Sequence, residues 1–273
     1  MKEYFISEID IEKLYHLSDI KIKLDSNKRQ HLLLTGKNGS GKTSLLLEIE
    51  KFLRAINDEK LSQVFDQYPT WINEAKKKVL SASSDSEKYA ADKDLKQCLG
   101  FLKKYSDGVQ INLNQYEGLE MMYHNGKFIT AYFPSERKAQ FMRPNGVENI
   151  TLENTYGIDE SAGDILLKYM VHLKTQQAYA RNEGDQTTAN QIQKWFDRFD
   201  SALQILLDEE SIHIEYDYKK YDFKIRQNGR EPFSFNELSD GYSSVIYIVS
   251  DLILRMDKNW LLEDKISEYD YQG

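Results

Sequence analysis

The stretch that decides the fold is Gly36-Lys37-Asn38-Gly39-Ser40-Gly41-Lys42-Thr43, which we call the glycine loop. It follows the apolar run Leu32-Leu33-Leu34, which predicts a buried strand. After the loop, apolar residues recur at helical spacing, namely Leu45, Ile49, Phe52, Leu53 and Ile56. A pattern G-x-x-x-x-G-K-[ST] between a strand and a helix predicts a phosphate site, because backbone N–H groups converge there at the positive end of the helix dipole.

Two side chains of the glycine loop have specific roles in such a site. Lys42 supplies a compact cation for the β- and γ-phosphates of a nucleoside triphosphate. The hydroxyl of Thr43 is the expected Mg²⁺ ligand. The sequence therefore predicts a protein that binds a nucleoside triphosphate.

Composition bounds the class of protein. The chain has 273 residues, of which 40% are hydrophobic and 29% charged, as in an ordinary globular protein with one large domain or two small ones. No apolar run approaches the ~18–20 residues that span a bilayer, and the N-terminus lacks the apolar stretch of a signal peptide. We therefore expect a cytoplasmic protein with no membrane partner. The single cysteine, Cys98, excludes an intrachain disulfide and a cysteine cluster for zinc.

The net charge of −8 argues against DNA binding through the overall charge. A local basic patch or a partner subunit could still supply the positive charge. The densest basic run, Lys76-Lys77-Lys78, lies in a predicted helix and is interpreted as a solvated face.

Periodicity predicts an α/β chain. Alternation at Ile20, Ile22 and Leu24 predicts antiparallel strands that lead into the glycine loop, and strand character returns at 109–113. A hairpin is predicted over 119–133, with its turn at Asn125-Gly126. A second hairpin is predicted at 212–225.

Helical spacing in two other regions predicts insertions into a nucleotide-binding head. We expect a helical insertion at 59–105 and a helical lobe of two antiparallel helices at 155–210. We expect the head to consist of 1–58, 106–150 and 211–273. After the predicted strand at 128–133, Ser135, Glu136 and Arg137 are candidate nucleotide or switch residues, because ligands collect at the carboxyl ends of strands in α/β sheets. A solvated loop is the alternative.

A second constellation lies near the C-terminus, at Leu238-Ser239-Asp240-Gly241-Tyr242. Ser239, Asp240 and Gly241 stand where a helix begins, with its first N–H groups free. The helix that follows is apolar on most of its surface and is expected to be buried. Taken alone, this stretch is equally typical of a capped core helix.

Together, the glycine loop and Leu238-Ser239-Asp240-Gly241-Tyr242 resemble the ATPase head of the ATP-binding-cassette type. The resemblance is to SMC, RecF and OLD-like AAA-family ATPases, specifically bacterial ATP-binding proteins linked to defence or virulence. Asp240 and Tyr242 depart from the commonest Leu-Ser-Gly-Gly-Gln form of the signature motif. The resemblance covers both ends of the chain and says little about 59–210. It implies a P-loop fold of ABC-ATPase type, with a mixed central sheet, an antiparallel β subdomain and helical insertions.

The resemblance also implies a mechanism in which two copies pack head to tail around ATP and Mg²⁺. Lys42 and the amides of Asn38 to Lys42 then hold the β- and γ-phosphates, Thr43 ligates Mg²⁺, and Ser44 lies by the α-phosphate. Leu238, Ser239, Asp240 and Gly241 form the signature stretch, in which Ser239 and the Gly241 amide reach the γ-phosphate of the partner's ATP. Such heads also use a glutamine that touches Mg²⁺ and water, for which Gln110 and Gln140 are candidates.

The chain departs from the family pattern after its last predicted helix. The family has an apolar strand ending in Asp-Glu, which holds Mg²⁺ and activates water, and a downstream switch histidine. Neither follows Met256 in this sequence, so we expect a truncated head that binds ATP but hardly hydrolyses it.

Two functions of different classes follow from these expectations. The first is an ATPase head of a DNA-repair or anti-phage assembly, whose ATP-dependent dimerisation controls a partner nuclease or another effector subunit. The second is a non-catalytic, nucleotide-sensing interaction module. A transporter cassette or a small-molecule kinase fits less well, because of the long insertions and the Leu-Ser-x-Gly helix start.

Overall fold

The computed structural model describes residues 3–134 and 141–262, with side chains in the last helix described as far as Asp257. The chain divides between Tyr132 and Phe133 into two compact units, the N-terminal unit and the C-terminal unit. The predicted head, built from 1–58, 106–150 and 211–273, draws on both units. Its boundaries therefore stay a prediction.

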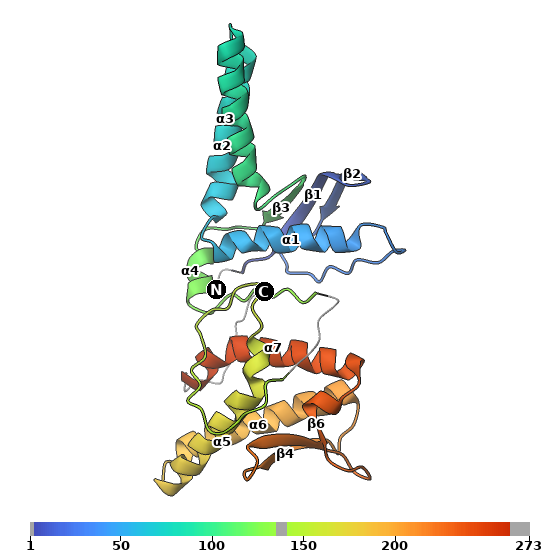
Figure 1. Ribbon diagram of the computed structural model, residues 1–273, viewed down its shortest axis with the longest axis vertical. Coiled ribbons are helices and arrows are strands. Elements are labelled where there is room, and N and C mark those ends of the chain that lie inside the picture. Colours follow the sequence, from blue (N-terminus) through green and yellow to red (C-terminus); the bar gives the residue numbers. More distant parts are fainter. Residues whose placement is uncertain (1–2, 135–140, 263–273) are drawn as a thin grey trace. The chain divides into compact units, whose positions relative to one another are not determined.

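The N-terminal unit is built on a three-stranded sheet. Its strands are β1 (Ile6–Leu14), β2 (Leu17–Lys23) and β3 (Val109–Leu113), in the order β2-β1-β3 with antiparallel pairing throughout (Figure 1). Ile9 pairs with Ile22 on one side and Ile111 on the other, so apolar side chains line one face. The strands predicted from the alternation of Ile20 and Ile22 and at 109–113 are confirmed.

Helix α1 (Lys42–Asn57) follows the glycine loop and packs on this sheet (Figure 1). Its buried apolar side chains recur at helical spacing and join Ile9, Ile11 and Ile111 in one core; they are Leu45, Phe52, Ala55 and Ile56. The predicted helix after the loop is confirmed. Its hydrophobic face fixes the loop to the rest of the unit.

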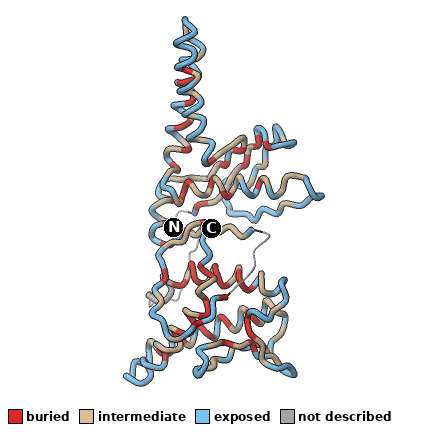
Figure 2. The backbone as a smooth tube through the Cα atoms, in the orientation of Figure 1, coloured by how far each residue is buried: buried red, intermediate tan, exposed pale blue. Residues whose placement is uncertain are grey.

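Residues 63–103 are helical except for the short loop 82–84. A π-helical turn η1 (Gln63–Gln67) leads into α2 (Tyr68–Ser81), which pairs with α3 (Asp85–Lys103). The pair extends from the sheet and is mostly exposed along its length, whereas buried residues concentrate in α1 and the strands (Figure 2). The side chain of Ser84 caps α3 by accepting a hydrogen bond from the Glu87 N–H.

The predicted strand at Leu32-Leu33-Leu34 is wrong. Residues 31–36 carry no regular secondary structure, and Leu33 is 85% exposed, although Leu34 packs against the core. An apolar run becomes a buried strand only if a neighbouring strand pairs with it. Both sides of β1 are occupied by β2 and β3, and no strand that the structure describes pairs with the leucines.

The predicted hairpin over 119–133 is also wrong. Residues 119–124 form the short helix α4 (Leu119–His124). Gly126 has φ 66°, its N–H donates to the Tyr123 carbonyl, and the Lys127 N–H donates to the Met122 carbonyl. These two bonds form a Schellman motif, the helix C-terminal turn that needs a left-handed residue. An Asn-Gly pair supplies that conformation equally well for a hairpin or a helix end, so its sequence does not distinguish them.

The C-terminal unit has three layers, of which two are helical and one is a β-sheet (Figure 1). Helices α5 (Leu166–Asn182) and α6 (Gln186–Leu207) lie between α7 (Asp240–Leu262) and a sheet of order β4-β5-β6. The strands of this sheet are β4 (His213–Asp217), β5 (Asp222–Arg226) and β6 (Phe233–Ser234). Two 3₁₀ turns, η2 (Ala162–Ile165) and η3 (Phe235–Glu237), precede α5 and α7.

One hydrophobic core joins all these layers, including Trp195, Phe199, Phe223 and Phe235. The predicted helices of 155–210 and the hairpin at 212–225 are confirmed. The helix pair shares its core with the hairpin and α7. The described strands of both units are antiparallel, so the structure is of the α/β class without the predicted mixed sheet.

A buried carboxyl group joins the three long helices of the C-terminal unit. Asp257 of α7 is 3% exposed, accepts a hydrogen bond from the Tyr169 hydroxyl of α5, and is also hydrogen-bonded by the side chain of Trp195 of α6. Burial raises the pKa of Asp257 from 3.8 to about 7, although the two hydrogen bonds partly offset this effect.

This pKa predicts a dependence of stability on pH. Between pH 4 and pH 7 the folded state binds a proton at Asp257 that the unfolded chain has lost, so the free energy of unfolding falls as pH rises. A difference of about 3 pKa units corresponds to roughly 4 kcal/mol, fully lost above pH 7. We expect Asp257→Asn, which carries no charge, can accept from Trp195 and can donate to the Tyr169 oxygen, to gain stability relative to the wild type as pH rises from 4 to 8. Chemical denaturation across this range measures it, and a pH-independent difference would contradict it.

Candidate functional site

The glycine loop adopts a backbone that only glycine accommodates at its end. Gly41 has φ 90°, and a Cβ atom there would lie 2.8 Å from Leu17 Cδ1 and 3.6 Å from His16 Cε1. The left-handed backbone at Gly41, together with its close packing against Leu17 at the turn between β1 and β2, favours glycine at this position. The end of the loop thus packs against this turn.

The Lys42 ammonium lies within the loop that precedes it. Its Nζ donates to the carbonyl oxygens of Gly36 and Lys37 at 2.8 and 2.9 Å, and lies 3.4 Å from Ser40 Oγ. At Gly36, a Cβ atom would come within 2.8 Å of the same Ser40 Oγ. The loop is thus closed around a positive charge, and its inward carbonyl groups are bound to that charge.

The start of α1 leaves backbone donors free at the same place. The Leu45 N–H makes the first helical bond, to the Gly41 carbonyl, so the N–H groups of Lys42, Thr43 and Ser44 precede the helical ladder. No side chain caps this end of α1, and its first turn contains no acidic residue. The helix dipole and the Lys42 charge therefore add, which favours an anion.

The remaining loop residues are accessible. Asn38, Gly39 and Thr43 are exposed, and a Cβ atom at Gly39 would meet nothing within 4 Å. An anion can therefore approach the loop from solvent. The structure brings the predicted residues Gly36, Asn38, Gly39, Ser40, Gly41, Lys42, Thr43 and Ser44 together as one loop and helix start.

The signature stretch lies in the C-terminal unit, at the predicted helix start. Leu238 packs against the core, whereas Ser239, Asp240 and Gly241 are exposed. The Ser243 N–H donates to the Ser239 carbonyl, which begins α7. Asp240 therefore lies in the first turn of the helix, where the dipole favours a carboxylate.

The structure also places some of the other candidates. Gln110 lies on β3 and is exposed, and its side-chain amide donates to Asn112 Oδ1 at 3.2 Å. Gln140 and the candidates Ser135, Glu136 and Arg137 lie outside the described residues. Within the described ranges 3–134 and 141–262, no three His, Cys, Asp or Glu side chains gather as a metal site would require.

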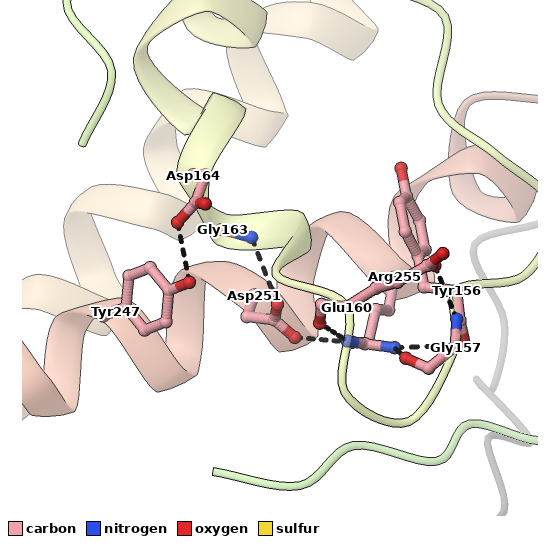
Figure 3. A network of polar contacts seen from close by, with 8 residues as sticks. All are labelled: Tyr156, Gly157, Glu160, Gly163, Asp164, Tyr247, Asp251 and Arg255. Carbon is pink, nitrogen blue, oxygen red and sulfur yellow. Dashed lines mark hydrogen bonds and ion pairs between the residues drawn. The ribbon is translucent and has the colours of Figure 1, made fainter. Parts of the chain in front are cut away.

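A buried polar network, which no motif of the sequence predicted, fixes α7 (Figure 3). Arg255 is 4% exposed and donates to the carbonyl oxygens of Tyr156 at 3.3 Å, Gly157 at 3.1 Å, and Glu160. Its Nε lies 2.5 Å from Asp251 Oδ2, one turn earlier on the same helix. The guanidinium thereby binds the loop before α5 to the middle of α7.

The 3₁₀ turn η2, which follows this loop, has two further attachments to α7. The Gly163 N–H donates to Asp251 Oδ1 at 3.1 Å, and the Tyr247 hydroxyl donates to Asp164 Oδ1 at 2.7 Å (Figure 3). A Cβ atom at Gly163 would lie 3.3 Å from Asp251 Cβ. The sequence contains one signal for this network, an acid and an arginine four residues apart in an otherwise apolar helix.

Comparisons with known proteins leave the family open, since no family model matches the chain and the curated proteins include no match. Among the helices that the structure describes, none combines the length and the apolarity needed to cross a lipid bilayer.

The network predicts a large effect of Arg255→Ala on stability. The substitution leaves the Asp251 carboxylate buried without its ion pair and three carbonyl groups without a donor, which is expected to cost about 3–5 kcal/mol. Urea denaturation measures the loss. The matched control is Arg226→Ala, which removes an exposed ion pair with Glu215 and is expected to change stability little. An Arg255→Ala variant as stable as this control would contradict the assigned role.

Proposed function

We propose that this protein binds ATP through the glycine loop. The observation that carries the proposal is the closure of the loop around Lys42, next to three backbone N–H groups that precede the helical ladder of α1. Backbone donors, a lysine ammonium and a helix N-terminus without acidic residues are the features that recognise a chain of phosphates.

In this proposal some groups of the loop bind the phosphates and one binds Mg²⁺. The N–H groups of Lys42, Thr43 and Ser44 can each donate to a phosphate oxygen, and the Lys42 ammonium can exchange its carbonyl partners for one. The exposed Thr43 hydroxyl supplies an oxygen ligand for Mg²⁺, which keeps most of its other ligands as water and phosphate. The bound nucleotide would supply the negative charge that this end of α1 lacks.

We further propose that two copies bind ATP head to tail, as the resemblance to ABC- and SMC-type heads implies. In this arrangement Ser239 and the Gly241 amide of one copy contact the nucleotide held by Lys42 of the other. The exposure of Ser239, Asp240 and Gly241 at the start of a firmly anchored helix supports it. The signature stretch is thus available to a second copy.

The biological setting belongs to the same proposal. A cytoplasmic head of this type would couple ATP-dependent dimerisation to DNA repair or anti-phage defence, through a nuclease or another effector subunit. The net charge of −8 disfavours DNA binding through the overall charge. Hydrolysis is outside the proposal, because the sequence after Met256 contains no apolar strand that ends in the Asp-Glu pair of the family.

The mass of the protein in solution with and without ATP and Mg²⁺ tests this function. We expect a dimer that forms only with nucleotide, measured by light scattering coupled to size-exclusion chromatography. Lys42→Ala should abolish both ATP binding and the dimer, because it removes the cation from the loop. Ser239→Arg should abolish the dimer and leave ATP binding intact, because the larger side chain blocks the signature surface.

Two matched variants control for nonspecific effects. Lys37→Ala removes an exposed charge from the same loop while its carbonyl stays in place, and Ser201→Arg adds the same bulk at an exposed position of α6. Both should behave as the wild type. A monomer under all conditions would overturn the head-to-tail arrangement, and ATP binding unchanged by Lys42→Ala would overturn the assigned site.

A further inference from the structure

The C-terminal unit contains a cavity of about 390 Å³ next to the start of α7. It is lined by the end of α6 and the loop after it, by the β5–β6 loop and strand β6, and by η3 and the start of α7. Its lining residues come from each of these elements: Leu207, Glu209, Ile212, Gln227, Arg230, Phe233, Glu237, Leu238, Ser239 and Tyr242. A volume of this size falls within the range of small-molecule sites.

The apolar part of the lining consists of Leu207, Ile212, Phe233 and Leu238. Ile212 is fully buried, and the other three side chains are half-buried, so they keep apolar surface toward the cavity. An apolar group of a ligand would gain free energy there by leaving water.

The two carboxylates of the lining already have internal partners. Glu209 accepts hydrogen bonds from the Ser211 N–H and hydroxyl at 3.1 and 2.8 Å, and from Gln227 Nε2 at 3.2 Å. These bonds hold the pKa of Glu209 below its usual value. Glu237 accepts from the Ser234 N–H at 2.5 Å in the capping box of η3. These contacts hold both carboxylates to other groups of the protein.

Three side-chain donors that line the cavity, in contrast, have no hydrogen-bond partner among the described residues. Arg230, Ser239 and Tyr242 are exposed at the rim, and across the described residues none of their side chains makes a hydrogen bond or ion pair. Arg230 lies near enough to Glu209 to contribute to the lowering of that carboxyl's pKa. The cavity therefore combines an apolar wall, one unpaired guanidinium and two hydroxyl donors.

We propose that this cavity binds a small carboxylic acid with an apolar body, aromatic or branched. The planar guanidinium of Arg230 would pair with the carboxylate, since that geometry allows two parallel hydrogen bonds. Ser239 and Tyr242 would donate to the same group, and the apolar body would contact Leu207 and Phe233. Because both carboxylates of the lining are hydrogen-bonded within the fold, the polar groups left for a ligand are the donors of Arg230, Ser239 and Tyr242, which fit an acceptor such as a carboxylate.

This binding site goes beyond the proposed nucleotide site. It lies wholly within the C-terminal unit and requires neither Lys42 nor ATP. Because Ser239 belongs to both, an occupied cavity would compete with the nucleotide of a partner copy; this consequence alone rests on the proposed function.

Titration of the full chain with phenylacetate in the absence of ATP tests the proposal, with phenylacetamide as the uncharged probe of the same shape. We expect saturable phenylacetate binding by calorimetry or ligand-observed NMR, at least 10-fold tighter than that of phenylacetamide. Arg230→Gln should remove this preference. Leu207→Trp, which fills the cavity, should abolish binding of both probes.

Arg226→Gln is the matched control, because this exposed arginine lies on the same sheet and pairs with Glu215. It should leave phenylacetate binding unchanged. Equal affinity for the two probes, no binding at millimolar concentration, or binding that survives Leu207→Trp in a folded variant would each overturn the proposal. None of these outcomes bears on ATP binding by Lys42, so the two proposals fail separately.

Discussion

The interaction on which the proposed site depends is the binding of the Lys42 ammonium by the carbonyl groups of its own loop. Carbonyl oxygens directed toward a helix N-terminus would repel an anion. In this loop the carbonyls of Gly36 and Lys37 are bound to a cation instead, while the N–H groups at the start of α1 remain available. The result is a short segment whose accessible polar groups are donors. Close packing of Gly41 on Leu17 then fixes this segment to the β1–β2 turn.

In the C-terminal unit, the exposed start of α7 is held in place in a different way. The α7 helix is attached in its middle by Arg255 and Asp251, whose charges are buried and satisfied by each other and by backbone groups of the loop before α5. Near its start, the capping box of η3 fixes the approach of the chain. Ser239 to Gly241 are therefore exposed at the start of a helix whose middle is anchored in the core. An anchored, exposed helix start is suited to recognition, since less ordering is needed on binding.

Much of the local structure could be predicted because it follows from short-range patterns. The alternation around Ile9 and Ile22 specifies strands, and the helix of Leu45, Phe52 and Ile56 follows from its apolar period. Leu32 to Leu34 illustrates the limit of such patterns, because strand formation depends on a pairing partner that local sequence does not encode. Asn125-Gly126 is ambiguous for a related reason: the conformation it supplies serves both a hairpin and a helix end. The glycine loop is contiguous, so its motif predicts it. The cavity near Tyr242 combines residues from α6, the sheet and α7, which are distant in the sequence, so no sequence pattern predicts it.

The claim that most needs a direct measurement is that the glycine loop binds the phosphates. Backbone amide chemical shifts, recorded for the ¹⁵N-labelled protein during titration with ADP and Mg²⁺ and with a non-hydrolysable ATP analogue, report on each N–H separately. We predict the largest saturable shifts at Gly39, Gly41, Lys42, Thr43 and Ser44, because their N–H groups lie at or next to the start of α1. Saturable nucleotide binding that leaves these amides unshifted, or no binding at millimolar nucleotide, would contradict the assignment.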